Sequence, residues 1–195
     1  MPDDDSSAEY PSAEYPTYLA TGPRVGIRPI VYGDGERFTA LARASVDLHH
    51  PWLAMPTTGT AWEAFYDGLD GPHREGFVIC ETVTGEPAGF ININNIARGR
   101  FQCGAVGYGA FAPSAGRGYM SEGMGLVLRH AFGPLGLHRL EANIQPGNER
   151  SLALVKRHGF RLEGFSPDFL FIDGAWRDHE RWAITSDGSP AAGLR

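Results

Sequence analysis

The chain has 195 residues, a formal net charge of −6 and 42% hydrophobic residues. This length fits one domain with a sizeable core, and no apolar run approaches the roughly 18–20 residues of a membrane span. Five acids lie within residues 1–18, which contain no Lys or Arg, so the rest of the chain has a net charge of −1. Such a nearly neutral body argues against broad nucleic-acid binding, which needs many basic residues to neutralise phosphates.

Residues 1–22 are predicted to form a flexible acidic extension, because they are rich in Asp, Glu, Pro and Ser. The extension contains a duplicated pentapeptide, residues 7–11 and 12–16, which is too short to be a solenoid repeat. Its two tyrosines either dock onto the body or a partner, or belong to a plain tail. The domain itself is expected to span residues 23–186, followed by a tail of residues 187–195.

The first half of the domain is predicted to contain a strand, two helices and two strands. Phe38 and Leu41 lie on one face of the first helix, and Trp62 and Phe65 on one face of the second. Between the helices, a loop carries Trp52 as an aromatic anchor. The expected elements are a strand at 24–29, helices at 35–46 and 60–69, and strands at 76–82 and 88–96.

The second half is predicted to contain a strand, a helix, a strand, a helix and a hairpin. Asn148 is a good N-cap, and Asp173-Gly174 is a strong two-residue hairpin signal. Three successive strands before the first of these helices favour a mixed, partly antiparallel sheet and an α+β fold. The expected elements are strands at 104–111 and 138–145, helices from about 120 to 132 and from 148 to 159, and strands at 160–171 and 175–184.

A glycine turn at residues 113–122 is the most informative local feature. Gly116 and Gly118 permit tight backbone conformations, and the helix start that follows offers free N–H groups and a positive dipole end to a phosphate. The Walker pattern is absent, and Ser121 stands where a dinucleotide-binding turn needs its third glycine. The local sequence alone leaves an ordinary strand–helix connector equally open.

The cysteines and histidines predict neither a metal site nor a redox pair. Cys80 and Cys103 are far apart and are expected to be buried thiols, and the seven histidines lack zinc-ligand spacing. The acidic N-terminus has no basic start and no apolar run of a signal peptide. A cytoplasmic protein without a metal is therefore expected.

Short motifs occur at several separated places in the domain. They are Asn92–Asn95 with Arg98, Gly99 and Phe101; Gly107 and Tyr108; Gly116–Met120 with Glu122; Leu137–Arg139; Asn148 and Ser151; Gly159, Phe160, Glu163 and Gly164; and Asp173, Gly174 and Trp176–His179. With the element order, they make the chain resemble the GNAT superfamily of acetyl-CoA-dependent N-acetyltransferases, and within it the ribosomal-protein-alanine acetyltransferases of RimJ/RimL type. The resemblance covers about residues 24–185 and implies a GNAT-like fold of about seven strands and about four helices.

The resemblance implies acetyl-CoA as cosubstrate, held by the strand before the glycine turn and the helix after it. Pro113 departs from the superfamily, which often has Gln or Arg there, and it removes one N–H donor near the cofactor. The implied contacts are the strand backbone of Phe111 and Ala112, the turn residues Gly116, Arg117, Gly118, Tyr119, Met120 and Ser121, and Asn148 and Lys156 on the next helix.

Two residues are candidates for the chemistry. The resemblance places Ser151 at the hydroxyl that faces the cofactor sulfur, so Ser151 is predicted to donate a proton to the departing thiolate or to stabilise it. The alternative is an ordinary residue in the first turn of a capped helix. Glu141 is the best internal carboxylate for a general base, and its alternative is an ion pair with Arg139 or another cation.

The acceptor is predicted to be a protein N-terminal α-amine. An α-amine has a pKa of about 7.7–8.0 against about 10.4 for Lys, so far more of it is already neutral at pH 7 and no strong base is needed. Asn92, Asn94 and Trp52 are candidates for acceptor contacts. A small amine, such as an antibiotic or a polyamine, and a non-catalytic acyl-CoA sensor remain alternatives. A homodimer is compatible with the sequence, which contains nothing that demonstrates one.

Overall fold

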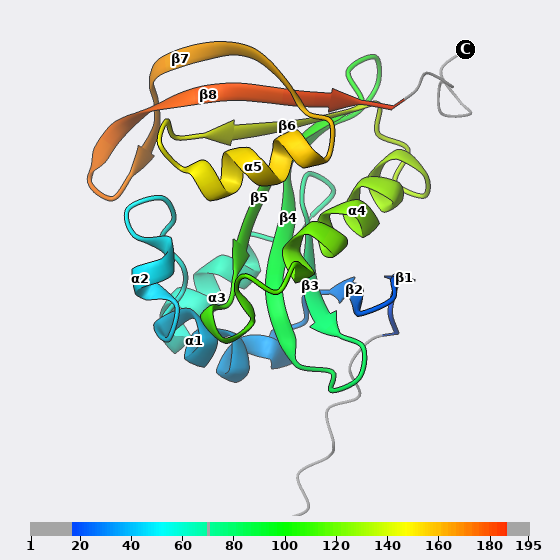
Figure 1. Cartoon of the computed structure of the whole chain (residues 1–195), viewed down its shortest axis with the longest axis vertical. Coiled ribbons are helices and arrows are strands. Elements are labelled where there is room, and N and C mark those ends of the chain that lie inside the picture. Colours follow the sequence, from blue (N-terminus) through cyan, green and yellow to red (C-terminus); the bar gives the residue numbers. More distant parts are fainter. Residues whose placement is uncertain (1–16, 70, 187–195) are drawn as a thin grey trace, which may run out of the picture.

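The computed structural model describes residues 17–69 and 71–186 (Figure 1). Within them, eight strands form one sheet in the order β1-β2-β3-β4-β5-β6-β8-β7. The strands are β1 (Ala20–Thr21), β2 (Val25–Pro29), β3 (Glu75–Glu81), β4 (Pro87–Ala97), β5 (Cys103–Ala110), β6 (Arg139–Ile144), β7 (Arg161–Ile172) and β8 (Ala175–Thr185). The α-helices are α1 (Gly35–Arg43), α2 (Val46–His49), α3 (Gly59–Asp67), α4 (Tyr119–Phe132) and α5 (Glu149–Arg157), with 3₁₀ turns at Tyr32–Asp34 and Ala112–Ser114.

The sheet divides where β5 meets β6. All its other pairings are antiparallel, whereas β5 and β6 are parallel and pair only from Cys103↔Arg139 to Ala105↔Glu141. Both strands continue beyond this point without pairing to each other. In Figure 1, β5 runs down beside β4 while β6 runs across with β7 and β8. We call this divergence, formed by residues 106–110 and 142–144, the fork.

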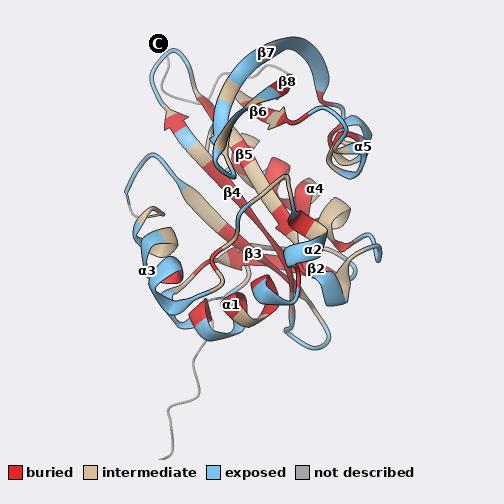
Figure 2. Ribbon diagram, turned by 90° about the vertical axis from the view of Figure 1, so that its left-hand side faces the viewer, coloured by how far each residue is buried: buried red, intermediate tan, exposed pale blue. Residues whose placement is uncertain are grey.

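Helices cover both faces of the sheet (Figure 2). Strand side chains alternate between the faces, so β3 sends Phe77 and Ile79 to one core and Val78 and Cys80 to the other. The first core contains residues of α4 and α5 such as Val127. The second core contains α1 and α3 residues and an aromatic cluster made of Phe38, Trp62, Phe90 and Phe111.

The sequence-predicted elements lie within a few residues of the observed ones, with two differences. The helix predicted at 35–46 is two helices, α1 and α2, separated at Ala44 and Ser45. The short strand β1 pairs with β2, so the sheet includes Ala20 and Thr21 of the stretch predicted as an extension. The duplicated pentapeptide and residues 187–195 lie outside the described residues.

Local signals explain several element ends. The predicted N-cap is confirmed, because Asn148 Oδ1 accepts a hydrogen bond from the Ser151 N–H at 3.2 Å. The hairpin turn is also confirmed: Asp173 and Gly174 both have positive φ, at 50° and 73°, and Ile172 faces Ala175 across a two-residue loop. None of the helices in the described ranges is long and apolar enough to cross a membrane.

Candidate active site

The glycine turn leads into α4 with six consecutive free amides. Gly116 and Gly118 have φ of 78° and 82°, a region that favours glycine, and α4 begins at Tyr119. The first hydrogen bond of the helix joins the Glu122 N–H to the Gly118 carbonyl at 3.2 Å. The N–H groups of residues 116–121 therefore have no acceptor within the described residues. This amide turn is a ready anion site, because helix dipole and free donors act together.

Two arginines flank the amide turn. The Arg24 guanidinium donates to the Arg117 carbonyl at 3.0 Å and forms an ion pair with Glu122 at 3.0 Å. Both Arg24 and Arg117 lie over the Tyr119 ring, at 5.3 and 4.8 Å from its centre. The Arg117 side chain is 54% exposed, and its ion pair with Glu81 is long, at 3.5 Å. Positive charge therefore stands beside the free amides and is accessible to a phosphate.

The remaining predicted residues of this part of the site link α4 to α5 and the sheet. Ser121 Oγ lies 3.1 Å from His158 Nε2, a contact between the first turn of α4 and the end of α5. Met120 packs against the core beside β4. The Lys156 ammonium lies 5.3 Å from the centre of the Trp182 ring, so at least part of its role is packing on β8.

At the fork, the edge of β5 that faces away from β4 is formed by the backbone groups of Tyr108 and Ala110. The Phe111 N–H bonds the Ala88 carbonyl at 2.9 Å, and in an antiparallel ladder every second residue bonds the same neighbour. The backbone groups of Tyr108 and Ala110 therefore point away from β4, toward the fork. Of these groups, only the Ala110 carbonyl is bonded, because it accepts a hydrogen bond from His49 Nε2 at 2.8 Å in the described residues.

This strand register does not fit the prediction that the backbone of Phe111 and Ala112 contacts acetyl-CoA. The Phe111 ring is fully buried and its N–H is bonded to β4, while the Ala112 N–H donates to Ser45 Oγ at 2.9 Å. Neither N–H is available to a cofactor. Sequence reasoning did not single out the backbone of Tyr108 and Ala110, because only the strand register reveals which backbone groups are free.

Two hydroxyl groups meet where α5 faces the fork. The Tyr108 hydroxyl donates to the Ser151 carbonyl over a long 3.4 Å. Burial raises the pKa of Tyr108 to about 12, so its phenol keeps its proton at neutral pH. The Ser151 side chain also lies within hydrogen-bonding reach of the Tyr108 hydroxyl, while the Ser151 N–H is held by Asn148. The predicted proton donor is thus a hydroxyl that contacts a protonated phenol.

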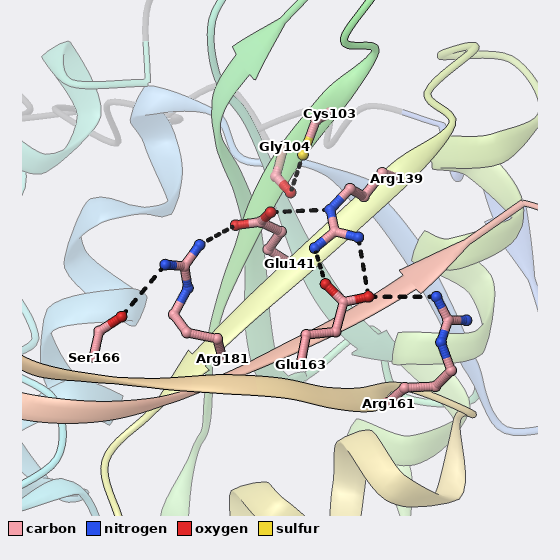
Figure 3. A network of polar contacts seen from close by, with 8 residues as sticks. All are labelled: Cys103, Gly104, Arg139, Glu141, Arg161, Glu163, Ser166 and Arg181. Carbon is pink, nitrogen blue, oxygen red and sulfur yellow. Dashed lines mark hydrogen bonds and ion pairs between the residues drawn. The ribbon is translucent and has the colours of Figure 1, made fainter.

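Glu141 lies in an ion-pair network on the β6–β8–β7 surface (Figure 3). One of its oxygens accepts from Arg139 Nε at 2.9 Å and the other from an Arg181 nitrogen at 3.2 Å. Arg139 also pairs with Glu163. Both carboxylate oxygens are bound to guanidinium groups. Glu141 therefore forms an ion pair, which was the alternative to its prediction as a general base.

The acceptor candidates lie on another side of the fork. Asn92 continues the Phe90 face of β4, toward the α1–α3 core, and its side chain is buried with Oδ1 unpaired. Asn94 follows on the same face and is partly buried. Trp52 is held beside the end of β6, where its carbonyl accepts from Gln145 Nε2 at 3.3 Å. The amide turn and Ser151 instead belong to α4 and α5, on the opposite face of the sheet (Figure 2).

No group of three or more His, Cys, Asp or Glu side chains in residues 17–69 and 71–186 is arranged to hold a metal ion. Cys80 and Cys103 are buried and free, and burial raises the pKa of both thiols.

Comparisons with known proteins identify the family. The family model described as acetyltransferase (GNAT) domain matches residues 24–161. The ribosomal protein uS5-alanine N-acetyltransferase of Escherichia coli K12 is 34% identical over 131 residues, which cover 65% of this chain and 68% of that protein. Mycobacterium smegmatis RimJ in complex with CoA-disulfide superposes with a TM-score of 0.77 at 31% identity, covering 84% of this chain and 82% of RimJ.

A third similarity shows the fold alone. The spermidine N-acetyltransferase of Vibrio cholerae in complex with CoA and spermine has a TM-score of 0.70 at 18% identity, covering 84% of this chain and 96% of that one. Together, the family model and the relatives show that this chain belongs to the GNAT acetyltransferase family. It is an N-acetyltransferase with acetyl-CoA as the acetyl donor, and the free amides of residues 116–121 fit the phosphates of that donor.

Proposed function

We propose that the chain acetylates the N-terminal α-amine of a protein, with ribosomal-protein N-termini beginning with Ala as the first candidates. The observation that carries this proposal is that both carboxylate oxygens of Glu141, the predicted base, are bound by arginines, Arg139 and Arg181. A site without a strong base suits an amine that is already partly neutral at pH 7. The E. coli relative, whose name specifies a ribosomal-protein alanine, supports the same acceptor.

In this proposal the two sides of the fork bind the two substrates. The amides of residues 116–121, with Arg117, hold the pyrophosphate of acetyl-CoA, while the backbone of Tyr108 and the Ala110 N–H align its pantetheine arm. Asn148 orients the first turn of α5, and Lys156 lies further along the same helix. Asn92, Asn94 and Trp52 contact the acceptor from the other face.

The chemistry is a direct transfer without a covalent enzyme intermediate. Acetyl-CoA supplies an acetyl group activated as a thioester. The neutral acceptor amine forms the new C–N bond as the C–S bond breaks, and the amine proton passes to water or to a backbone carbonyl. Ser151 Oγ–H donates a hydrogen bond to the departing thiolate, or a proton that it regains from water, and its place beside the Tyr108 phenol at the start of α5 supports this role. The Tyr108 phenol beside it keeps its own proton at neutral pH.

The test is thiol release from acetyl-CoA against three kinds of acceptor. The panel contains peptides with free Ala or Ser N-termini, the same peptides blocked at the N-terminus but carrying Lys, and small amines including spermidine. We expect release only with free N-termini. Release only with small amines would replace the proposal with metabolite or drug modification. Binding of acetyl-CoA without release on any member would favour a sensor instead.

A further inference from the structure

Residues 45–52, which run from the end of α1 through α2 to Trp52, contact both arms of the fork. We call them the 45–52 segment. On one arm, the segment bonds the end of β5 through Ser45 and His49. On the other arm, it bonds the residue after β6 through Trp52 and Gln145. His50 Nδ1 also lies 3.8 Å from a carboxylate oxygen of Asp173 at the tip of the β7–β8 hairpin.

The contacts with β5 fall on alternate backbone positions. Ser45 is fully buried; its hydroxyl donates to the Leu41 carbonyl at 2.6 Å and accepts from the Ala112 N–H at 2.9 Å. The His49 side chain is 8% exposed, and its Nε2–H donates to the Ala110 carbonyl at 2.8 Å. These two bonds hold the chain between Tyr108 and the amide turn, the two places where free backbone groups bind acetyl-CoA in the proposed function.

Gly109 of β5 allows His49 to approach the strand closely. A Cβ added at Gly109 would lie 3.0 Å from His49 Cε1 and 2.8 Å from Phe90 Cε1, so a side chain here would force His49 aside. The glycine lets the 45–52 segment pack directly onto the strand. Sequence reasoning treated this region as a loop with an aromatic anchor, Trp52, and a candidate acceptor contact, and did not connect it to the cofactor side.

We propose that Ser45 and His49 are positioning residues for acetyl-CoA, and that the 45–52 segment couples acetyl-CoA binding to the acceptor side of the fork. They never touch the cosubstrate in this proposal. They act through the backbone at Ala110 and Ala112, which fixes where the Ala110 N–H and the amides of residues 116–121 point. The same segment carries Trp52, so a shift of β5 on binding moves the acceptor side as well. The proposal depends on the acetyl-CoA-dependent activity and not on which amine is acetylated.

The experiment measures coenzyme A binding by titration calorimetry for Ser45→Ala, His49→Leu and His49→Gln in the full chain. Loss of either bond leaves a buried backbone group unsatisfied and lets the turn move, so Ser45→Ala and His49→Leu should weaken binding by about tenfold. His49→Gln keeps an N–H donor and should restore binding to within about threefold. Hydrogen exchange should rise at residues 110–121 in the two weakened variants and stay unchanged in β2.

A matched control separates positioning from general destabilisation. Ile30→Val trims a buried side chain of the second core, which contacts Gly76 at the start of β3, and should lower the melting temperature while leaving coenzyme A binding unchanged. Wild-type binding in Ser45→Ala would overturn the proposal, even if His49→Leu fails to fold. Equal weakening in His49→Leu and His49→Gln would also overturn it, because the imidazole would then act by packing and not by its hydrogen bond.

The coupling has its own readout. In the wild type, saturating coenzyme A should tighten binding of an acceptor peptide, and Gln145→Leu, which removes the anchor on the far arm, should reduce that effect without abolishing coenzyme A binding. If acceptor affinity is the same with and without coenzyme A in the wild type, the coupling half of the proposal is wrong.

Discussion

Ser151 carries a side-chain hydroxyl at the start of α5, next to the Tyr108 phenol of the fork. Replacing it with Ala should lower kcat by about a hundredfold, the scale of a positioned proton donor. The KM for acetyl-CoA and the melting temperature should change little, because the substitution removes only a single side-chain contact, the one with the Tyr108 phenol. Steady-state kinetics and thermal unfolding check this. Unchanged kcat in Ser151→Ala would transfer the donor role to the Tyr108 phenol or to water.

Asn148 can be tested against a matched cap elsewhere. Its Oδ1 caps α5 at 3.2 Å, and Thr58 Oγ1 caps α3 at the same distance, remote from the fork. Asn148→Ala and Thr58→Ala should each reduce the free energy of unfolding by about 1 kcal/mol. Because the Asn148 oxygen is already occupied, we expect coenzyme A affinity to change by less than about threefold in both. A selective loss in Asn148→Ala would instead show that its side chain touches the cofactor.

The substitution Glu141→Gln tests whether this carboxylate acts as an ion-pair partner or as a general base. Its two oxygens are bound by Arg139 and Arg181, so Glu141→Gln should retain kcat to within about threefold, whereas loss of a base costs about 10²–10⁴. The pH profile of kcat/KM for a peptide acceptor should keep its acidic limb. Disappearance of that limb, together with a large loss of kcat, would restore the base assignment.

The amide turn can be tested as an element by comparing two glycines. Gly116 and Gly85 both have positive φ, at 78° and 74°, and a Cβ at either would meet no atom within 4 Å. Ala at either position should cost about 1 kcal/mol of stability through backbone strain alone. Only Gly116→Ala should also weaken coenzyme A binding, by about tenfold, because it redirects the free amides. Equal binding in both variants would argue against the turn as the phosphate site.

At the scale of elements, local sequence predicts most of the fold. Alternation predicts β3 and β4, and cap and turn residues such as Asn148 and Gly174 predict where α5 and the last hairpin begin and turn. The break between α1 and α2 could not be predicted, because Ser45 finds its partner at Ala112, 67 residues away. The helical pattern continues through the break, so only a long-range hydrogen bond reveals why the chain turns there.

At the scale of the molecule, the site depends on how strands pair, and the sequence does not encode this locally. The motifs predict the glycine turn and Ser151, but not that β5 and β6 stop pairing after Ala105 and Glu141. That divergence leaves the backbone groups of Tyr108 and the Ala110 N–H without a strand partner and brings the 45–52 segment across the opening. The same topology places Glu141 beside Arg181, which is 40 residues away, and so favours an ion pair over a base.

Stability of the whole molecule should fall at mildly acidic pH. Burial lowers the pKa of His49, His158 and His179 below the usual value of 6.5. Below about pH 6.5 the unfolded chain therefore holds more protons on these side chains than the folded chain does. Each such extra proton makes the free energy of unfolding fall by about 1.4 kcal/mol per pH unit. Their contribution is fully present above pH 6.5 and is lost as the pH drops through the folded pKa values.

Two carboxylates extend the effect to lower pH. Hydrogen bonds from Tyr119 and Arg139 hold the pKa values of Glu81 and Glu163 below the usual 4.5, so their contribution is present above pH 4.5 and lost below it. Urea unfolding between pH 8 and 5 should give a constant free energy down to about pH 7 and then a decline. His158→Gln, which removes one of the three imidazoles, should make that decline shallower. A free energy of unfolding that stays flat from pH 8 to 5 would mean that these imidazoles are not kept neutral by burial.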